Sequence, residues 1–180
     1  ELTRDLDTDN AIGLDMSLPK LYVDSNGNTP DFPKPYRTME SKIKREQRKL
    51  SRKEKGSKNY EKQRIKLAKQ HAKAKHLRND VLHKLSCALT DRYDLIAIED
   101  LDMSAIKRSL RFGKSASDNG WGMFTDMLSY KAKRKGKQLV KVDRWFPSSK
   151  TCSHCGHIYK ELRLSDRIYL CPKCGHTMDR

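Results

Sequence analysis

The stretch DLIAIED, residues 94–100, is a compact apolar run between acidic residues. Such a run predicts a short buried strand of the kind found in parallel sheets. A second run, AIGLDM (11–16), also ends close to an acid, and LYVDSNG (21–27) follows it with an Asn-Gly turn signal. These two runs predict a β-hairpin, and QLVKVDRWF (138–146) predicts a further strand.

Helical periodicity fills the segment from Thr38 to Asp91. Apolar or neutral positions recur every three or four residues at Met39, Ile43, Gln47 and Leu50, and again at Leu77, Val81, Leu85 and Leu89. The glycine in KEKGSKNY (53–60) interrupts the pattern, which predicts an αα-hairpin. A third helix is expected to begin at a cap, Ser117 or Asp118, and to continue through Trp121, Phe124, Leu128 and Ala132 to Gly136. Strands and helices in this order predict an α/β fold.

The charge of the chain is strongly basic and localised. The 180 residues are 36% apolar and carry a formal net charge of +16. Residues 34–84 hold 19 Lys or Arg against 5 Asp or Glu, so this segment carries nearly the whole excess. Such a charge attracts polyanions, chiefly nucleic acid. No run of about 18 apolar residues is present, so we expect no membrane span. The sequence begins without Met, and we expect a fragment of a longer protein.

Lysines recur along one face of the second helix of the predicted hairpin. They are Lys58, Lys62, Lys66, Lys69 and Lys73, with Arg64 and Arg78 beside them. Phosphate neutralisation needs only charge and reach, so this face is expected to bind a nucleic-acid backbone without reading its sequence. A solvated helix face is the alternative. Lys150 and Arg163, nearer the C-terminus, are further candidates for phosphate contact.

Four cysteines follow the spacing C-x2-C-x15-C-x2-C, as Cys152, Cys155, Cys171 and Cys174. Four thiolates in a tetrahedral array suit Zn²⁺ and leave no open position for a substrate, so the predicted site is structural. A segment this short buries little core, and metal binding is expected to supply its folding free energy. Reduced or disulfide-linked cysteines are the alternative. The remaining cysteine, Cys87, is expected in the core, and this pattern of cysteine use indicates a reducing compartment.

Two acids, Asp15 and Glu99, each follow a predicted buried strand. Ligands of open α/β sheets bind at the carboxyl ends of strands, so the two carboxylates meet there if their strands are neighbours. Such carboxylates repel each other, and a divalent cation such as Mg²⁺ or Mn²⁺ is the usual remedy. Two ions about 3.5–4 Å apart can hydrolyse a phosphodiester. The alternative is that each acid only marks where its strand meets solvent.

The aromatic residues include two close pairs. Trp121 and Phe124 lie one helical turn apart and are expected in the core. Trp145 and Phe146 are adjacent, so we expect one of them in the core and the other available to the cysteine segment or to a base.

Several motifs resemble the C-terminal half of the TnpB (OrfB-type) transposase-associated proteins, which are RNA-guided DNA endonucleases related to the miniature type V CRISPR effectors. The motifs are GLDMS (13–17), IAIEDLDM (96–103), LVKVDRWFPSSKTCSHCG (139–156) and LSDRIYLCPKCGHTMDR (164–180). The resemblance implies an α/β fold with a ribonuclease-H-like (RuvC-like) mixed sheet, an inserted basic αα-hairpin and a four-cysteine zinc ribbon. The implied organisation is the first strands in 1–37, the helical hairpin in 38–92, the remaining strands and helix in 93–148, and the zinc ribbon in 149–180.

The resemblance also implies catalytic residues. The family's first acid falls on Asp15 and its second on Glu99. The third belongs to an Asp-Arg-Asp-x-Asn-Ala motif, of which this chain supplies Asp179 and Arg180, and the motif's second Asp would be the next residue. We therefore expect a transposon-encoded DNA endonuclease whose cleavage is impaired in this chain, with Asp179 as a neighbouring candidate.

The resemblance implies DNA and a guide RNA as partners, structural Zn²⁺ and catalytic Mg²⁺ or Mn²⁺ as cofactors, and the prokaryotic cytoplasm as the compartment. The oligomeric state stays open. A non-catalytic zinc-ribbon fragment that binds nucleic acid is the alternative function.

Overall fold

The computed structural model describes residues 10–109, 118–143, 145–163, 165–166 and 168–179. It comprises two compact units, Glu1–Val142 and Asp143–Arg180, and each is described by itself. No helix in the described part of the chain is long and apolar enough to cross a membrane.

The first unit contains a mixed four-stranded sheet in the order β2-β1-β3-β4. The strands are β1 (Ala11–Ser17), β2 (Leu21–Asp24), β3 (Leu95–Glu99) and β4 (Gln138–Val142). The predicted hairpin of β1 and β2 is confirmed by their antiparallel pairing. Strands β1 and β3 pair in parallel although about 80 residues separate them, with Ile12 opposite Ile96 and Leu14 opposite Ile98. Strand β4 extends the sheet in parallel on the other side of β3.

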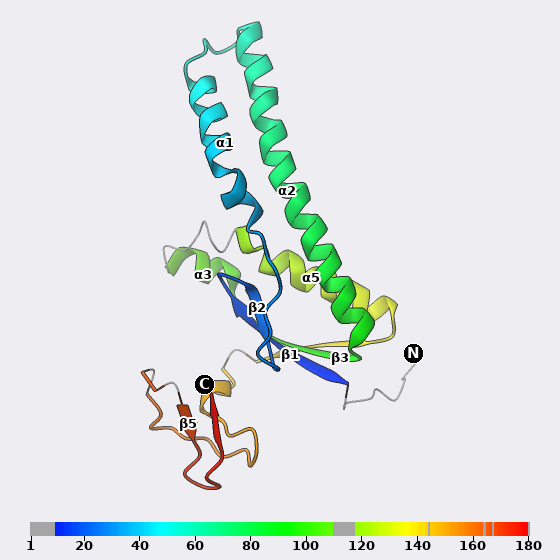
Figure 1. Ribbon diagram of the computed structural model, residues 1–180, viewed down its shortest axis with the longest axis vertical. Helices are drawn as coiled ribbons and strands as arrows, with labels where there is room; N and C mark the ends of the chain where they lie inside the picture. The colour runs from blue at the N-terminus through cyan, green and yellow to red at the C-terminus, as the bar shows by residue number, and fades with distance from the viewer. Residues whose placement is uncertain (1–9, 110–117, 144, 164, 167, 180) are drawn as a thin grey trace. The chain divides into compact units, whose positions relative to one another are not determined.

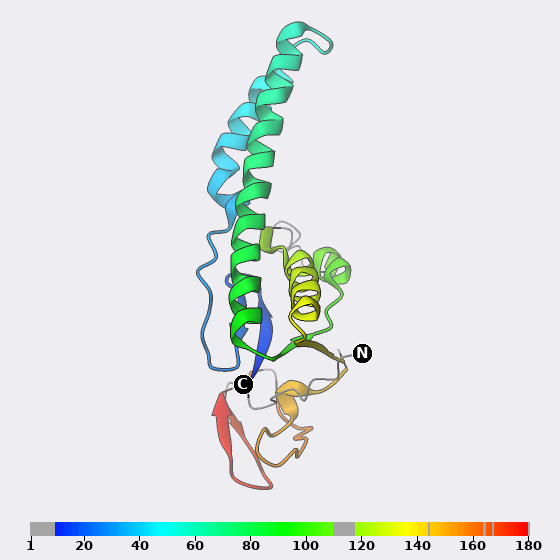
Figure 2. The same ribbon diagram turned by 90° about the vertical axis from the view of Figure 1, so that its right-hand side faces the viewer.

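One face of the sheet is buried by two helices, α2 (Lys58–Arg92) and α5 (Trp121–Arg134). Alternating residues of β1 and β3 point to this face because side chains along a strand alternate between its two sides. They form one core with the C-terminal half of α2 and with α5, whose most buried members are Leu82, Leu89, Trp121, Phe124 and Leu128. Trp121 and Phe124 are therefore core residues, as predicted. Figure 1 and Figure 2 show both helices beside the strands.

The predicted αα-hairpin consists of α1 (Pro35–Ser51) and the N-terminal half of α2 (Figure 1). Ser57 caps α2, since its hydroxyl accepts the backbone N–H of Tyr60 at 3.1 Å. The two helices share a narrow apolar stripe whose buried members are Met39, Ile43, Leu67 and Ala74. A buried polar pair lies at the same interface, where the Gln63 amide donates to the Glu46 carboxylate at 2.8 Å. These hydrogen bonds lower the pKa of Glu46 to about 2, with Gln63 as the main cause and Lys49 next.

Three details of the helices differ from the sequence prediction. Asp118 does not cap α5; its carboxylate accepts the backbone N–H groups of Tyr36 at 2.8 Å and Arg37 at 3.2 Å and so caps α1. The other proposed cap, Ser117, lies outside the described residues. Leu77 is 42% exposed, because the buried stripe of α2 shifts to Leu82 and Leu89 where the helix meets the sheet. Cys87 is exposed instead of buried, and it accepts a hydrogen bond from the Lys131 ammonium at 3.1 Å.

Two further elements differ from the sequence prediction. A short helix, α3 (Met103–Ser109), follows β3 where no helix was predicted. Asp102 explains it, because the carboxylate accepts the backbone N–H groups of Ser104 and Ala105 at 2.9 and 3.0 Å, as a helix cap does. Strand β4 ends at Val142, earlier than the predicted 138–146 strand, because the chain turns at Asp143.

The second unit is small and has a core built around cysteines. Its antiparallel strands are β5 (Ile168–Leu170) and β6 (Thr177–Asp179), and a short 3-10 helix, η1, covers Ser148–Lys150. The buried residues of this unit are Cys152, Leu162, Tyr169 and Cys171.

Candidate functional site

Asp15 and Glu99 lie at equivalent positions of two neighbouring parallel strands. The pairing of Leu14 with Ile98 places Asp15 beside Glu99 one residue further along. Both side chains point away from the helix-covered face, since Leu14 and Ile98 are buried and the next residue of each strand is not. The two acids therefore share the open face of the sheet near the carboxyl ends of β1 and β3.

The electrostatics of this pair follow from the placement. Desolvation at the sheet raises the pKa of Asp15, although a hydrogen bond with the backbone of Met16 opposes the change. Desolvation also raises the pKa of Glu99, and the neighbouring Asp15 charge raises it further. Two carboxylates that are costly to ionise together form a ready set of oxygen ligands for a divalent cation.

Of the other acids near strand ends, Asp24 and Asp102 accept hydrogen bonds that stabilise the local backbone. Asp24 accepts the backbone N–H groups of Asn26 at 3.0 Å and Asn28 at 2.8 Å, as expected for a turn residue. Asp102 caps α3. The backbone of Asp179 belongs to β6, opposite Ile168, while its side chain lies outside what the structure describes.

The four cysteines predicted as metal ligands lie together. Their Sγ atoms are all within 4.8 Å of one another, so the cluster can hold a metal ion such as zinc. Cys152 and Cys174 have their sulfurs 3.7 Å apart, and Cys155 and Cys171 have theirs 3.6 Å apart. A disulfide needs about 2.05 Å, whereas tetrahedral zinc with Zn–S bonds of about 2.3 Å places its sulfurs about 3.8 Å apart. The geometry fits the metal and excludes the disulfide-linked alternative.

The two Cys-x-x-Cys-Gly-His knuckles repeat the same backbone hydrogen bonds. Gly156 N–H donates to Cys152 O, and Gly175 N–H donates to Cys171 O, both at 2.9 Å. Both glycines have a positive φ, 69° and 71°, which turns the backbone around the sulfurs. Burial raises the pKa of the Cys171 thiol, yet hydrogen bonds with the backbone of Cys174 and Lys173 outweigh it and lower this pKa to about 6. The backbone therefore favours a thiolate at Cys171. A hydrogen bond with the backbone of His176 lowers the pKa of Cys174, but burial and the neighbouring cysteines outweigh it and raise this pKa to about 12.

The histidines of this unit stay outside the cluster. The His154 and His176 rings stack with their centroids 5.6 Å apart, and the four possible ligand atoms of the cluster are all cysteine sulfurs.

The predicted lysine row is exposed along α2. Lys58, Lys62, Lys66, Lys69 and Lys73 are all exposed, and among the described residues none of them forms an ion pair. Arg64 differs, because its Nε lies 2.7 Å from the Glu61 carboxylate. The lysine charges are therefore available to an anionic partner.

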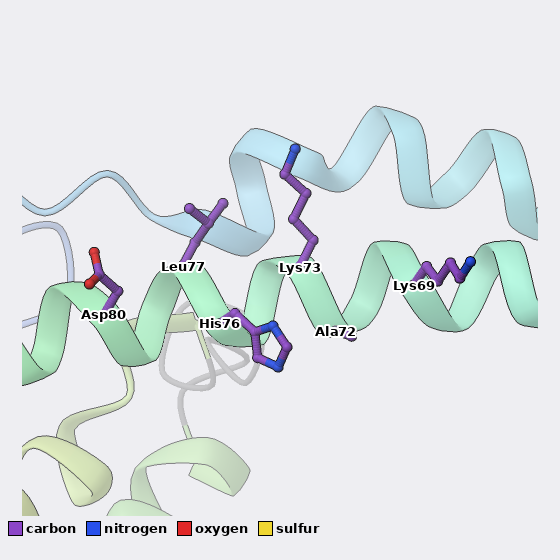
Figure 3. A pocket seen from close by; sticks show the side chains of 6 residues that line it. All are labelled: Lys69, Ala72, Lys73, His76, Leu77 and Asp80. Atoms are coloured by element: carbon purple, nitrogen blue, oxygen red, sulfur yellow. The ribbon is translucent and has the colours of Figure 1, made fainter.

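A shallow depression of about 440 Å³ lies on α2 at the end of the lysine row. Figure 3 shows its lining, which comes from this one helix: Lys69, Ala72, Lys73, His76, Leu77 and Asp80. The exposed apolar side chains of Ala72 and Leu77 lie between charged ones, so the depression can contact an apolar group while its lysines bind an anion. The sequence predicted the two lysines but not the depression.

Three other predicted phosphate contacts occupy different settings. Arg78 is only partly exposed, and its Cδ lies 3.1 Å from where a Cβ at Gly120 would be, so its stem packs at the base of the hairpin. The Lys150 ammonium donates to the backbone carbonyl of Lys160 at 2.7 Å and fastens a loop of the second unit. Arg163 is exposed, and its backbone N–H donates to the Asp166 carboxylate at 2.9 Å.

Comparison with known proteins identifies the family of the chain. The family model OrfB_IS605, described as a probable transposase, matches residues 2–110, and the model of a Cas12f1-like TNB domain matches residues 121–180. The chain belongs to the OrfB_IS605 family.

Two curated relatives carry the name "Putative RNA-guided DNA endonuclease". The one from Streptomyces pristinaespiralis is 38% identical over 94% of this chain and 42% of its own length. The other, InsQ from Escherichia coli strain K12, is 33% identical over 92% of this chain and 45% of its own length. The chain thus spans less than half the length of these OrfB_IS605 relatives.

Solved structures show the same fold at low sequence identity. A cryo-EM structure of a Cas12f1-sgRNA-target DNA complex covers 93% of this chain and 46% of its own, with a TM-score of 0.55 and 17% identity. A CRISPR-Cas12f ternary complex covers 99% of this chain and 38% of its own, with a TM-score of 0.57 and 18% identity. The likeness supports the mixed α/β architecture described above.

Proposed function

We propose that this chain is the nuclease part of a transposon-encoded, RNA-guided DNA endonuclease of the prokaryotic cytoplasm, in which Asp15 and Glu99 hold Mg²⁺ or Mn²⁺. One observation carries the proposal: the two carboxylates stand side by side on the open face of parallel strands β1 and β3, where desolvation raises the pKa of both and the Asp15 charge raises that of Glu99 further. The names of the relatives and the Cas12f likeness support the same reaction class. The mixed strand order, with one antiparallel edge, supports a ribonuclease-H-like assignment.

Asp15 and Glu99 would act as the metal ligands of this reaction. Asp15 and Glu99 bind the cation through one carboxylate each and fix its position, because rigid paired strands carry both groups. The cation, when bound, supplies an activated water and stabilises the leaving oxygen of the phosphodiester. The pairing of β1 with β3 thus sets the distance between the two ligands.

The lysine row would bind the backbone of a nucleic acid, which we propose to be the duplex of guide RNA with target DNA. The five exposed lysines lack carboxylate partners among the described residues, so each can neutralise a phosphate. The depression beside Lys69 and Lys73 would contact the sugar between two phosphates. Backbone contacts of this kind position a duplex and do not read its sequence.

The cysteine cluster would hold structural Zn²⁺ and form a zinc ribbon. Cys152, Cys155, Cys171 and Cys174 provide four thiolates and leave no position for a substrate. Asp179 lies shortly after the second knuckle, and we propose that this ribbon fixes the start of the family's third acidic motif. Asp179 itself is a weaker candidate ligand than the acid that follows Arg180 in that motif.

A plasmid-nicking assay tests the proposal. The chain, and a version extended by Asp-x-Asn-Ala, are incubated with supercoiled DNA and Mn²⁺. We expect nicking by the extended version that disappears in Asp15→Ala and Glu99→Ala and persists in Asp126→Ala, an exposed acid on α5. Equal nicking by Asp15→Ala and the unchanged chain would show that the pair is not catalytic.

The alternative function is a nucleic-acid-binding zinc ribbon with a basic hairpin and no catalysis. It is favoured by the lysine row and the cysteine cluster, neither of which requires a second metal. Mn²⁺ binding by calorimetry separates the two functions, since only the nuclease predicts an affinity that falls in Asp15→Ala and Glu99→Ala.

A further inference from the structure

Two large aromatic side chains stand exposed where the second unit begins. Trp145 is 85% exposed and Phe146 is 50% exposed. The prediction that one of this pair lies in the core is therefore wrong. By contrast, the aromatic side chains of Trp121 and Phe124 in the first unit are only 2% and 0% exposed. Aromatic rings contribute strongly to folding when buried, so an exposed adjacent pair indicates a contact surface.

The turn that carries the two rings is held by several hydrogen bonds. The backbone N–H of Trp145 donates to the Asp143 carboxylate at 2.7 Å, and the N–H of Phe146 donates to the Asp143 carbonyl at 3.0 Å. Pro147 follows, and its carbonyl accepts the Lys150 N–H at 2.9 Å and the Thr151 hydroxyl at 2.8 Å. The rings are thus presented from a defined turn and do not lie on an unstructured tail.

The charge of the second unit indicates the chemistry of its partner. Residues 143–180 contain seven Lys or Arg against four Asp or Glu, and Lys160 and Lys173 are exposed. Exposed aromatic rings and an excess of positive charge are two features with which proteins bind single-stranded nucleic acid, because bases stack on the rings and phosphates contact the cations. A base-paired duplex does not offer the faces of its bases, so the partner must be unpaired.

We propose that Trp145 and Phe146 form a stacking platform for the bases of a single nucleic-acid strand. This proposal deepens the proposed function, because it names a single strand as the form of nucleic acid that the second unit binds for the nuclease. The platform accepts any base, because every base has a stacking face. It adds affinity that does not depend on phosphate neutralisation.

The chain contains a direct reporter of this contact. Its two tryptophans are Trp121, which is buried, and Trp145, so a change of tryptophan emission on ligand binding reports on Trp145. The zinc-loaded chain is titrated with a twelve-nucleotide oligothymidine and with an abasic strand of the same length and charge. We expect quenching by the oligothymidine, little quenching by the abasic strand, and none by a relaxed covalently closed circular duplex, which has no terminal base pairs.

Variants measure the contribution of each ring. Trp145→Ala is expected to weaken oligothymidine binding about 5- to 100-fold and Phe146→Ala somewhat less, with abasic-strand binding unchanged. The slope of affinity against salt should stay the same in both, because neither ring neutralises a phosphate. Tyr130→Ala is the matched control, since Tyr130 is a 42% exposed aromatic residue on α5 and should have no effect.

Two results would contradict the stacking proposal. Equal affinity and quenching with the abasic and the thymidine strands would show that charge alone holds the strand. A fall of several degrees in the melting temperature of Trp145→Ala would show that the ring is covered by protein. The stacking proposal and the nuclease proposal can fail independently. Asp15→Ala should bind the oligothymidine and be quenched by it like the unchanged chain. If the oligothymidine binds as expected but no metal-dependent nicking is found, the nuclease proposal fails and the stacking proposal stands.

Discussion

Neutralising one acid of the Asp15–Glu99 pair should stabilise the protein when no divalent cation is present. The strands that carry the two carboxylates lie about 4.8 Å apart. At that separation two like charges repel by about 0.9 kcal/mol in a fully aqueous dielectric and by more in a partly buried one. Because both groups are partly exposed, we use the screened end of this range, about 1 kcal/mol. For a unit of 142 residues this corresponds to a rise in melting temperature of about 3 °C.

The pKa shifts of the two acids determine whether they stabilise or destabilise the folded protein at a given pH. The pKa of each acid is raised in the folded protein, so the folded state binds these protons more tightly than the unfolded chain does. The stability that the folded protein gains from holding these protons is present below the ordinary pKa of a carboxyl group, and it is lost as the pH rises through the raised pKa values. At neutral pH, the cost of ionising the two acids in the folded protein lowers the free energy of unfolding.

The assay is thermal unfolding at neutral pH followed by near-ultraviolet circular dichroism. Asp15→Asn and Glu99→Gln are compared with Asp126→Asn, which removes the same charge from an exposed position on α5. We expect the first two variants to melt about 3 °C higher without Mn²⁺ and the control to stay unchanged. Mn²⁺ at 100 times its dissociation constant should stabilise the unchanged chain by about 2.7 kcal/mol and the two variants by much less. The reasoning is refuted if the variants melt no higher than the control and gain as much from Mn²⁺ as the unchanged chain.

Three further predictions follow from the other sites. Replacing Lys62, Lys66 and Lys69 together by Gln should reduce the slope of log affinity against log salt for a duplex by about 3, measured by fluorescence anisotropy; an unchanged slope would remove these lysines from the interface. Cys155→Ala should abolish tight zinc binding and unfold the second unit while the first keeps its melting transition, as seen by nuclear magnetic resonance; a folded second unit without zinc contradicts a structural role. Glu46→Gln should remove stability that the hairpin has above the ordinary pKa of a glutamate and loses as the pH falls toward about 2. Acid titrations of helicity should therefore show the unchanged chain to be the more stable one above that window and the two proteins to converge as the pH falls through it.

Local patterns in the sequence were sufficient for the strands and for the cysteine cluster. The β-hairpin follows from two apolar runs that lie close together in the chain, the second of which ends in an Asn-Gly turn signal. The cluster follows from the spacing of four cysteines. The parallel pairing of β1 with β3 could not be predicted from the sequence and had to be assumed, since no local feature specifies which strands become neighbours. The placement of Asp15 beside Glu99 depends on that pairing.

The errors of the sequence prediction arose from contacts between distant residues. Asp118 looks like the cap of the helix that follows it, yet it caps α1, about 80 residues earlier. Leu77 continues a regular apolar stripe but is exposed, because α2 changes partner from α1 to the sheet along its length. Cys87 sits in an apolar stretch but contacts the ammonium of Lys131 on another helix. None of these contacts can be seen in the local pattern.

The continuity of α2 has a mechanical consequence. The helix runs without interruption from Lys58 to Arg92, and at 1.5 Å per residue it is about 52 Å long. Its lysines extend over about 22 Å, and about 28 Å of the same rod separates Lys73 from the end that adjoins the sheet. Such a rod is a spacer of fixed length, so a duplex lying on the lysines is kept at a constant offset from the sheet. Inserting seven residues, about two whole turns, between Lys73 and the end that adjoins the sheet keeps the lysines on the same face and should shift where along its ligand the protein acts by about 10 Å, roughly three base-pair steps.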